Sequence, residues 1–350
     1  MEVRLPERGA DLQAITSGGV DSLARSRLPA GRSCDGLGVR VIGARRVTAF
    51  RQSRSVADVS ERFWGKLPAG SRQALVDGLS ASELQSVLLD VSRERAAKVT
   101  PARLMQRWRE DRFVRPSTAD PRALVQTQQR LWGALPERFA GVELSPVTPL
   151  GTCSAVATIN QHQVLSTIRG TEVASDPTNE LAIEAAVRRR AGQARVDLAA
   201  CQRVVRAQSV DGAGMFAHFQ LFVLVSSARD TGSGRTEAEL LIDHLNFWAD
   251  VLGESADLTF TTFTPSAVTE RIEDTVRPAV RATLREDSER TKSATYYTGT
   301  ALGVGMRDAE LGDGGFTSWT ADLLGDAKER CLTSCISTER LTAVSADLRQ

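Results

Sequence analysis

The stretch from 196 to 229 constrains the fold more than any other, because it has the pattern of two strands joined by a loop. The first strand is predicted around Leu198 to Val205 and the second around His218 to Ser226, and both are rich in apolar residues. The connecting loop contains Asp211 and two glycines. Apolar runs separated by a loop with Gly are typical of a β-hairpin. The sequence therefore predicts a long antiparallel strand pair here.

Polar side chains lie at the two strand ends next to the hairpin loop. Arg206 and Gln208 follow the first strand, and His218 and Gln220 open the second. Because side chains alternate between faces along a strand, we expect all four to project from one sheet surface. A guanidinium beside a loop suits a triphosphate, because its planar fork pairs bidentately with phosphate oxygens. The hairpin is therefore a candidate nucleotide site.

Overall charge and cysteine usage exclude several classes of protein. The formal net charge is +1 over 350 residues, so no global field selects nucleic acid or a membrane surface. No apolar run is long enough to span a bilayer, and the start does not resemble a secretory signal. The five cysteines form no Cys-x-x-Cys pair, which indicates reduced thiols and no metal site. We expect a cytoplasmic protein without a membrane partner.

The N-terminal residues 1–54 are predicted to form a basic, irregular or partly disordered extension. They hold ten Arg against five acidic residues and show no sustained periodicity. A nucleic-acid arm is the alternative, but Phe50 is the sole aromatic residue, so base stacking is not supported. Within this segment, Ser17 to Ser22 match the SGGxDS loop of the ATP pyrophosphatases. No strand–helix pattern follows to build that fold, so we interpret the string as a chance match.

Residues 55–135 are predicted to be a helical region, because apolar residues recur three and four positions apart. We expect Trp64, Trp108 and Trp132 to pack its helices together. This region would either cap the rest of the chain or carry an acceptor. From 136 to 350 strands and helices mix, and composition alone predicts a soluble α+β protein.

The order of elements in this last region follows from periodicity and from Pro and Gly punctuation. We predict strands at Ala155–Asn160 and Val164–Ile168, a helix at Glu180–Arg190, a helix at Arg235–Leu252, a strand at Asp257–Phe263 and a charged helical stretch from Pro265 to Asp287. Pro278 is expected to kink or split that stretch. His244 lies on the apolar face of its helix and is expected to be a hydrogen-bonded core residue.

Several segments from 139 to 343 resemble, in family order, the class II aminoacyl-tRNA synthetases. The hairpin resembles motif 2, with Gln208 in place of the family's Glu. Residues 139–146 resemble motif 1, whose Pro ends a strand at the dimer interface. Residues 171–190 resemble the strand, turn and helix that hold the amino acid's ammonium group in the histidyl branch. A simpler interpretation of Asp176 in that turn is a helix cap.

The C-terminal third carries the rest of the resemblance. Lys292 to Gly299 is similar to the histidyl signature Arg-Gly-Leu-Asp-Tyr-Tyr-Thr-Gly, with Lys in the Arg position. Residues 313–324 stand where that branch has Gly-Gly-Arg-Tyr-Asp and a helix. The last segment resembles motif 3, Gly-x-Gly-x-Glu-Arg, with Cys335 and Ser337 replacing the two glycines. The nearest branches are histidyl-tRNA synthetase and its paralogue, the regulatory subunit of ATP phosphoribosyltransferase.

This resemblance implies an α+β fold, an antiparallel sheet flanked by helices and preceded by the helical region, built as a homodimer. It also implies ATP and Mg²⁺ as cofactors and a small acid as substrate. Arg206 and Lys292 would contact the α-phosphate and Arg340 the γ-phosphate, as catalytic cations. The nucleotide would further contact Gln208 and Glu339. The substrate would be held by Asp176, Glu180, His218, Gln220, Tyr296 and Tyr297.

Two functions follow from the resemblance. The first is ATP-dependent activation of a small amino or carboxylic acid as an acyl-adenylate, with a tRNA or a carrier protein as acceptor. The second is a non-catalytic paralogue that acts as a regulatory or ligand-sensing subunit, which the loss of the motif 3 glycines favours. The chain ends about ten residues after motif 3. A housekeeping tRNA synthetase with its anticodon-binding domain is therefore not expected.

Overall fold

A computed structural model describes residues 56–208 and 216–347. By contact density the chain divides into two units, Met1–Phe63 and Trp64–Gln350. Helix α1 (Val56–Trp64) runs up to this boundary, and the fold that follows is that of the second unit. The whole predicted extension 1–54, with its SGGVDS string, and the hairpin loop around Asp211 lie outside the described residues.

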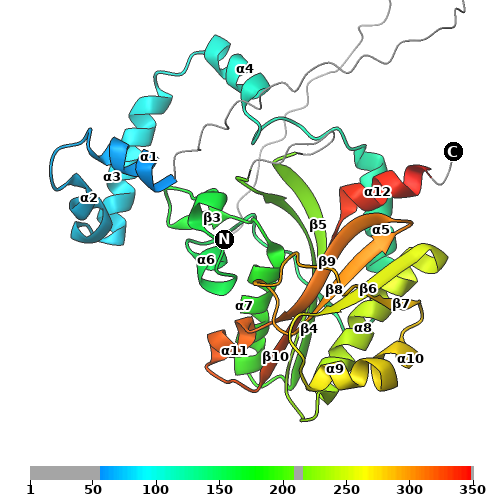
Figure 1. The fold of residues 1–350 in the computed structure, drawn as a ribbon. Coiled ribbons are helices and arrows are strands. Elements are labelled where there is room, and N and C mark those ends of the chain that lie inside the picture. Colours follow the sequence, from blue (N-terminus) through cyan, green and yellow to red (C-terminus); the bar gives the residue numbers. More distant parts are fainter. Residues whose placement is uncertain (1–55, 209–215, 348–350) are drawn as a thin grey trace, which may run out of the picture. The chain divides into compact units, whose positions relative to one another are not determined.

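The second unit is built on one eight-stranded sheet (Figure 1). The strand order is β1-β4-β5-β10-β9-β8-β6-β7. All pairs from β4 to β6 are antiparallel, whereas β1 and β7 join the edges in parallel. The strands are β1 (Ala140–Gly141), β4 (Arg195–Val205), β5 (His218–Arg229), β6 (Ala256–Thr262), β7 (Leu284–Glu286), β8 (Thr300–Met306), β9 (Ala309–Thr317) and β10 (Glu329–Ser337). A separate pair joins β2 (Val147–Pro149) to β3 (Thr171–Val173).

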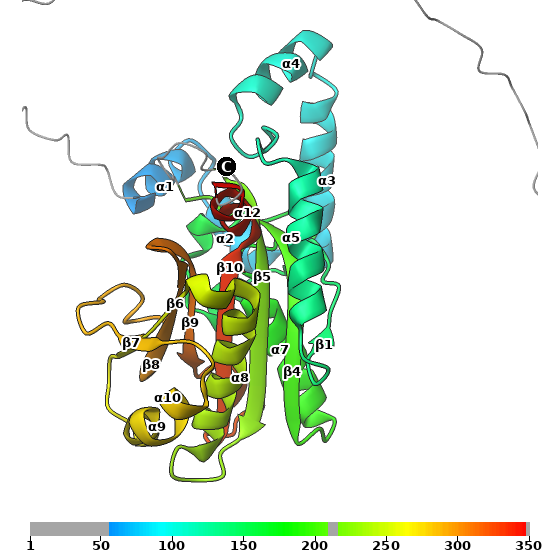
Figure 2. The same cartoon turned by 90° about the vertical axis from the view of Figure 1, so that its right-hand side faces the viewer.

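Helices cover both faces of the sheet (Figures 1 and 2). One face carries α6 (Thr152–Val156), α7 (Pro177–Arg190) and α11 (Trp319–Leu324). The other carries α5 (Pro121–Ala134), α8 (Arg235–Leu252), α9 (Ala267–Arg271), α10 (Arg277–Ala279) and α12 (Thr338–Asp347). We call these the α7 face and the α8 face. This architecture confirms the predicted α+β fold with an antiparallel sheet flanked by helices.

The hairpin of β4 and β5 lies inside the sheet, between β1 and β10, and both of its faces are apolar. On the α8 face Phe222 stacks on Phe247 at a centroid distance of 5.7 Å and meets the edge of Trp248. On the α7 face Leu221 and Val223 pack under α7. Burial of such side chains contributes roughly 25 cal/mol for each Å² of apolar surface removed from water. The two-sided burial therefore fixes the strand register.

A buried hydrogen-bond chain ties α8 to the sheet. Ser226 Oγ donates to Asp197 over 2.6 Å and lies 2.9 Å from His244 Nε2. His244 Nδ1 lies 2.9 Å from Ser334 Oγ, which accepts from Trp248 Nε1. The Nε2–H tautomer of neutral imidazole satisfies every group in this chain. His244 is thus the hydrogen-bonded core residue that the sequence predicts.

Residues 152–168 do not form the two strands predicted at Ala155–Asn160 and Val164–Ile168. They fold instead into α6 and a short 3₁₀ turn, Gln161–Gln163. The cause is Glu172, which is fully buried. Its carboxylate accepts from the amides of Gly151 and Cys153 and from the side chain of Gln161. A buried carboxylate needs such donors, and they draw the segment around it.

The predicted helices of the region before the sheet are present, but the expected tryptophan core is not. They are α1, α2 (Ser71–Gln73), a π turn (Ala74–Gly78), α3 (Ala81–Ala96), α4 (Pro101–Glu110) and α5. Ser80 and Thr100 cap α3 and α4. Neither helix has a buried residue, and Trp108 is 55% exposed. Trp132 packs on Phe222 instead. The expectation that these tryptophans pack the helices together is therefore wrong for Trp108 and Trp132, whereas Trp64 is half-buried and contacts Arg72 of α2.

The remaining predictions differ from the structure mainly at element ends. α8 has the predicted bounds, and α7 begins three residues before the predicted start. The charged stretch after Pro265 contains α9, a π turn (Ile272–Val276) and α10, and the helix ends directly after Pro278. Among the helices of 56–208 and 216–347, none combines the length and hydrophobicity of a membrane span.

We predict that stability falls on acidification because of His244. Burial, with Arg195 and Arg138 adding to it, lowers the pKa of His244 from 6.5 to about 3. Below pH 6.5 His244 is therefore protonated in the unfolded chain, whereas it stays neutral in the folded protein until the pH approaches 3. The slope should approach about 1.4 kcal/mol per pH unit between pH 6 and pH 4.

Urea unfolding at several pH values would measure this slope. His244→Gln should flatten it by about one proton, whereas Ser334→Ala, which keeps the imidazole buried, should lower stability and retain the slope. An unchanged slope in His244→Gln would contradict the assignment.

Candidate functional site

Strand register assigns the hairpin's polar residues to opposite faces of the sheet. Val204 pairs with Phe219 and Val205 with His218. Val204 and Phe219 belong to the apolar cluster under α7. Arg206, two residues after Val204, follows on that face and lies over the Phe219 ring at 5.1 Å. The prediction that Arg206, Gln208, His218 and Gln220 share one surface is therefore wrong for His218 and Gln220.

Arg206 is anchored at the N-terminus of α7. Its Nε donates to the Ser175 carbonyl over 3.0 Å, and its Nη2 lies 3.6 Å from the Asp176 carboxylate. Asp176 is also the N-cap of α7, since it accepts from the Thr178 amide, as a helix cap was expected to do. The Arg206 side chain keeps 35% exposure. One edge of its guanidinium is thus held while the group still reaches solvent.

Tyr296 and Tyr297 close this cluster. The Tyr296 hydroxyl donates to Asp176 over 3.2 Å, and its ring stands edge-on to Tyr297 and Trp319. The Tyr297 hydroxyl donates to Asp313 over 3.0 Å. Burial above all, with nearby carboxylates, raises the pKa of both tyrosines, so both remain hydroxyl donors.

Glycine in β9 makes this aromatic arrangement sterically feasible. A Cβ on Gly315 would stand 2.6 Å from the ring of Tyr297. Any other residue at this position would therefore displace the tyrosine. The segment 313–317 forms the end of β9 on this face, and the helix that the resemblance implies within 313–324 is α11.

Two carboxylates near the start of α7 differ in charge state. Burial raises the pKa of Glu180 to about 8, and the charges of Asp176 and Glu172 add to this. One Glu180 oxygen is buried without any hydrogen-bond partner, as is the amide oxygen of Asn179. Burial would also raise the pKa of Glu172, but its donors outweigh that effect and lower it. Glu180 is thus an acid that stays protonated near neutral pH, and its buried oxygen has no donor among the described residues.

A buried arginine that sequence reasoning missed completes the α7 face. Arg290 donates to Asp313 over 2.9 Å and to the Leu302 carbonyl, and its side chain is 10% exposed. The signal was present, because Arg290 precedes Lys292 by two residues in the segment that resembles the histidyl signature. Lys292 itself pairs with Glu310 at the surface, where its side chain is 62% exposed.

Arg340 and Lys292 meet at one residue. The Glu310 carbonyl accepts from the Arg340 guanidinium over 3.4 Å, while its carboxylate pairs with Lys292. β4 ends at Val205 opposite the start of β5, and β10 ends at Ser337 opposite Leu221. Arg206 and Arg340 therefore follow strands that finish at the same end of the sheet.

The other predicted residues form a structural network on the α8 face. Glu339 accepts from the Gln220 amide over 2.9 Å and from Arg203. The Gln220 side chain accepts from Gln128 and Thr338. His218 lies between Arg203 and the Arg115 carbonyl. These contacts secure the sheet end and place none of these groups with Arg206.

Cys335 and Ser337, which replace the motif 3 glycines, lie at different places in the fold from each other and from Gln208. Cys335 pairs with Val223 and Asp313 and lies on the α7 face, where burial raises the pKa of its thiol. Ser337 Oγ accepts from the Arg340 amide. Gln208 donates to Gln163 over 2.8 Å at the surface. A Cys side chain thus stands on the face that carries Arg206.

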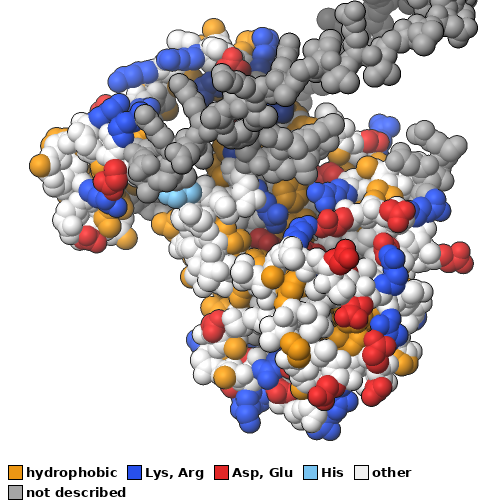
Figure 3. Space-filling model, in the orientation of Figure 1, with side chains coloured by type: hydrophobic (Ala, Val, Ile, Leu, Met, Phe, Trp, Pro, Cys, Tyr) orange, Lys and Arg blue, Asp and Glu red, His pale blue; other side chains and the backbone are white. Residues whose placement is uncertain are grey.

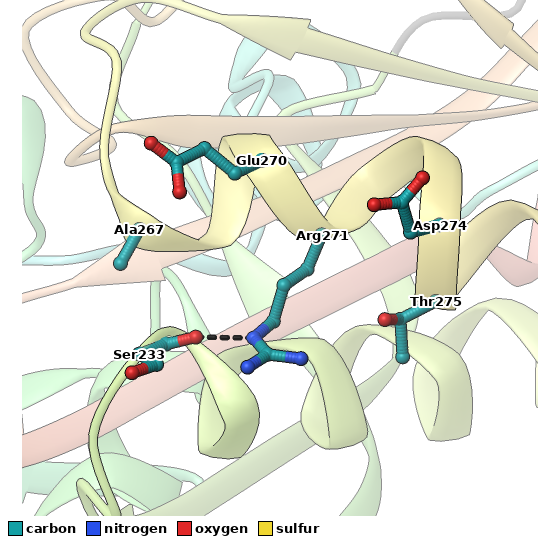
Figure 4. A pocket seen from close by; sticks show the side chains of 6 residues that line it. All are labelled: Ser233, Ala267, Glu270, Arg271, Asp274 and Thr275. Atoms are coloured by element: carbon teal, nitrogen blue, oxygen red, sulfur yellow. Dashed lines mark hydrogen bonds between the residues drawn. The ribbon is translucent and has the colours of Figure 1, made fainter.

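A surface hollow of about 420 Å³ lies at a different place, between Ser233 and the helix that begins at Ala267 (Figure 4). It is lined by Glu270, Arg271 and Asp274, and Arg271 is tied to the Ser233 carbonyl. None of the predicted site residues lines it. Within the described chain, no three His, Cys, Asp or Glu side chains are grouped as metal ligands.

Comparison with solved structures identifies the fold. A histidine–tRNA ligase subunit from Alicyclobacillus acidocaldarius matches with a TM-score of 0.51 and 12% identity, over 67% of this chain and 97% of that chain. Histidyl-tRNA synthetase from Nostoc sp. PCC 7120 matches with a TM-score of 0.50 and 12% identity, over 67% and 74%. An ATP phosphoribosyltransferase regulatory subunit/histidyl-tRNA synthetase from Bacillus halodurans has a TM-score of 0.49, 12% identity and coverage of 63% and 79%.

The chain has a class II synthetase-like fold, as its motif order predicts. No protein-family model matches it, and neither does any curated protein sequence. At 12% identity the likeness extends to the fold and leaves the activity to the chemistry of the site.

We predict that Glu180→Gln stabilises the protein increasingly as pH rises. The folded protein keeps Glu180 protonated up to about pH 8, whereas the unfolded chain ionises it near pH 4.5. The stability that this difference supplies is complete below pH 4.5 and is lost as pH rises through 8. Gln has no such loss, so its gain in melting temperature should be near zero at pH 4.5 and several degrees at pH 8.

Glu184→Gln, one turn along α7, is the control for removing one negative charge from the helix. A gain that is equal at every pH, or equal in the two variants, would refute the assignment of Glu180 as a buried neutral acid.

Proposed function

We propose that this protein activates a small amino acid with ATP as an acyl-adenylate. The observation that carries the proposal is the cluster at the start of α7, where Arg206 meets Asp176 and Tyr296 beside the unpartnered acid Glu180. The carboxyl groups of Asp176 and Glu180 and the tyrosine rings suit an ammonium group. The partly exposed guanidinium of Arg206 suits a carboxylate or phosphate oxygen.

The chain's own residues then have separate tasks. Asp176 and Tyr296 would orient the ammonium group, and Glu180 would lose its proton as a cation binds next to it. Arg206 would stabilise negative charge that develops on the oxygens between acid and phosphate. Its bond to Ser175 holds the group in place before any ligand arrives, so little reorganisation is needed.

Arg340 and Lys292 are the cations that could bind the phosphates of ATP, and they differ in how available they are. The Arg340 guanidinium is exposed and, within the described chain, donates one long hydrogen bond of 3.4 Å, so it would be available to a terminal phosphate. Lys292 must exchange its Glu310 partner to do the same. Bound Mg²⁺ would supply charge neutralisation on the phosphates, and Glu310 offers a surface carboxylate at this end of the sheet. The proposal includes a cytoplasmic homodimer with a tRNA or carrier-protein acceptor.

A second candidate is a ligand-sensing subunit without chemistry. Cys335 favours it, because its side chain stands on the Arg206 face at a position where the resembled motif has glycine. In this case the same cluster would bind an amino acid, but ATP would add nothing.

We predict that Arg206→Ala lowers amino-acid-dependent exchange of pyrophosphate into ATP by at least about a hundredfold. Pools of amino acids with ATP and Mg²⁺ would first identify the substrate class. Arg229→Ala is the matched control, because Arg229 ends the same hairpin at the far end of the sheet and is paired at the surface with Asp326. Full exchange by Arg206→Ala would overturn the proposed role.

Ligand-dependent melting separates the two candidates. An adenylating enzyme should be stabilised more by its amino acid with a non-hydrolysable ATP analogue than by the amino acid alone, because two ligands bind the folded state. Stabilisation by the amino acid that the analogue does not increase, together with no exchange, would establish the sensing subunit instead.

A further inference from the structure

The segment from 93 to 115 concentrates positive charge on a nearly neutral protein. It contains eight basic residues against three acidic ones, whereas the whole chain has a net charge of +1. α4 forms its middle, and every residue of α4 is exposed. Figure 3 shows Lys and Arg side chains gathered over the surface that α4 forms. A local field of this kind attracts polyanions even where the global charge does not.

Most of these cations have no acidic partner in the described chain. Elsewhere on the protein, arginines pair with carboxylates, as Arg189, Arg281 and Arg330 do. Among residues 56–208 and 216–347, no carboxylate lies within 4.0 Å of five cations of the segment, namely Arg95, Lys98, Arg103, Arg107 and Arg109. Unpaired arginines in a row are available to phosphate oxygens.

An aromatic and apolar stripe runs between these arginines. Leu104 and Trp108 are four residues apart and share a helix side with Met105. They are 59%, 55% and 59% exposed, respectively. Arg107 and Arg109 flank Trp108 in sequence and project to either side of the stripe. The surface therefore offers a ring for stacking with a cation on each side.

Helix stability does not account for this arrangement. Arg107 and Arg109 lie in the last turn of α4, where positive charge favours the helix dipole. Arg103 lies in the first turn, where positive charge opposes it. An exposed Trp also adds no packing to a helix that has no buried residue. Arg103 and the exposed Trp108 therefore do not stabilise α4, which indicates that they serve to bind a ligand.

We propose that residues 93–115 bind single-stranded RNA. Unpaired cations would contact its phosphates, and Trp108 would stack on an unpaired base, the combination that proteins use for single strands. A duplex hides its bases from such a ring, and single-stranded nucleic acid in cells is mostly RNA. Nothing in this surface depends on the proposed adenylation, so the two proposals stand or fall separately.

The segment also contacts the hairpin directly. Arg112 donates to the carbonyls of Ala207 and Gln208, the residues that follow Arg206. His218 meets the Arg115 carbonyl over 2.8 Å. The C-terminal end of the RNA-binding segment is therefore joined to the strand ends that carry the candidate site. RNA bound to α4 would thus contact a segment that is hydrogen-bonded to the strand ends of the candidate site.

The test is fluorescence anisotropy of the full chain with a labelled 20-nucleotide RNA of mixed sequence, without ATP or amino acid. Replacing Arg103, Arg107 and Arg109 together by Gln should weaken binding about tenfold or more at 0.1 M salt. It should also reduce the slope of log K against log salt by about 2, since each phosphate contact contributes about 0.7 for single strands. Trp108→Ala should weaken single-strand binding about tenfold and duplex binding little.

The matched control replaces Arg122, Arg169 and Arg307 by Gln, three exposed arginines elsewhere that have no carboxylate partner among the residues that the structure describes. This variant carries the same net charge and should keep the affinity of the unaltered protein. Equal loss in both triple variants, tighter binding of the duplex form of the same RNA, or binding of anionic lipid vesicles that requires Trp108 and exceeds RNA binding would each overturn the proposal. Circular dichroism of every variant excludes loss of α4 as the cause.

Discussion

Strand alternation in the hairpin of β4 and β5 determines which face of the sheet carries each of the hairpin's charged groups. Because Val205 pairs with His218, Arg206 emerges with Phe219 on the α7 face and Arg203 with His218 on the α8 face. A register shift of one residue would exchange these sets. The apolar clusters on both faces prevent such a shift, since it would move buried side chains to the wrong side. Core packing thus separates the charges of the candidate site on the α7 face from the charges on the α8 face that secure the sheet end.

Elements with local determinants were predictable from the sequence. The hairpin and α8 follow from apolar periodicity, and the start of α7 follows from Asp176 and Pro177, an N-cap and a first-turn proline. The segment 152–168 was not predictable, because its shape depends on donors that converge on Glu172 from 11 to 21 residues away. The prediction that Trp108 packs between helices was wrong for a related reason. Helical spacing predicts a helix, but it does not reveal whether a partner surface exists.

The candidate site was predictable as residue types and not as geometry. Motif order pointed to Arg206, Asp176 and Tyr296, and these three are in contact. The same reasoning placed His218 and Gln220 with them, because the length of the loop concealed the register of the second strand. It also preferred Lys292 to Arg290, although the buried partner of Asp313 is Arg290. Which of two nearby cations is buried depends on tertiary contacts that a motif does not encode.

The α7 face retains a group whose local environment is unfavourable. Glu180 is half-buried, and one of its carboxyl oxygens is buried without a donor among the described residues, whereas its neighbours Glu172 and Asp176 have donors. The cost of desolvating that oxygen is therefore not offset within the described chain. A protein selected for stability alone would place Gln or an apolar residue there. When a protein keeps a residue that lowers its stability, as Glu180 does here, that residue is a candidate for a role in function. A bound cation would ionise Glu180 and supply the missing partner, so the stability lost in the free protein would be recovered on binding.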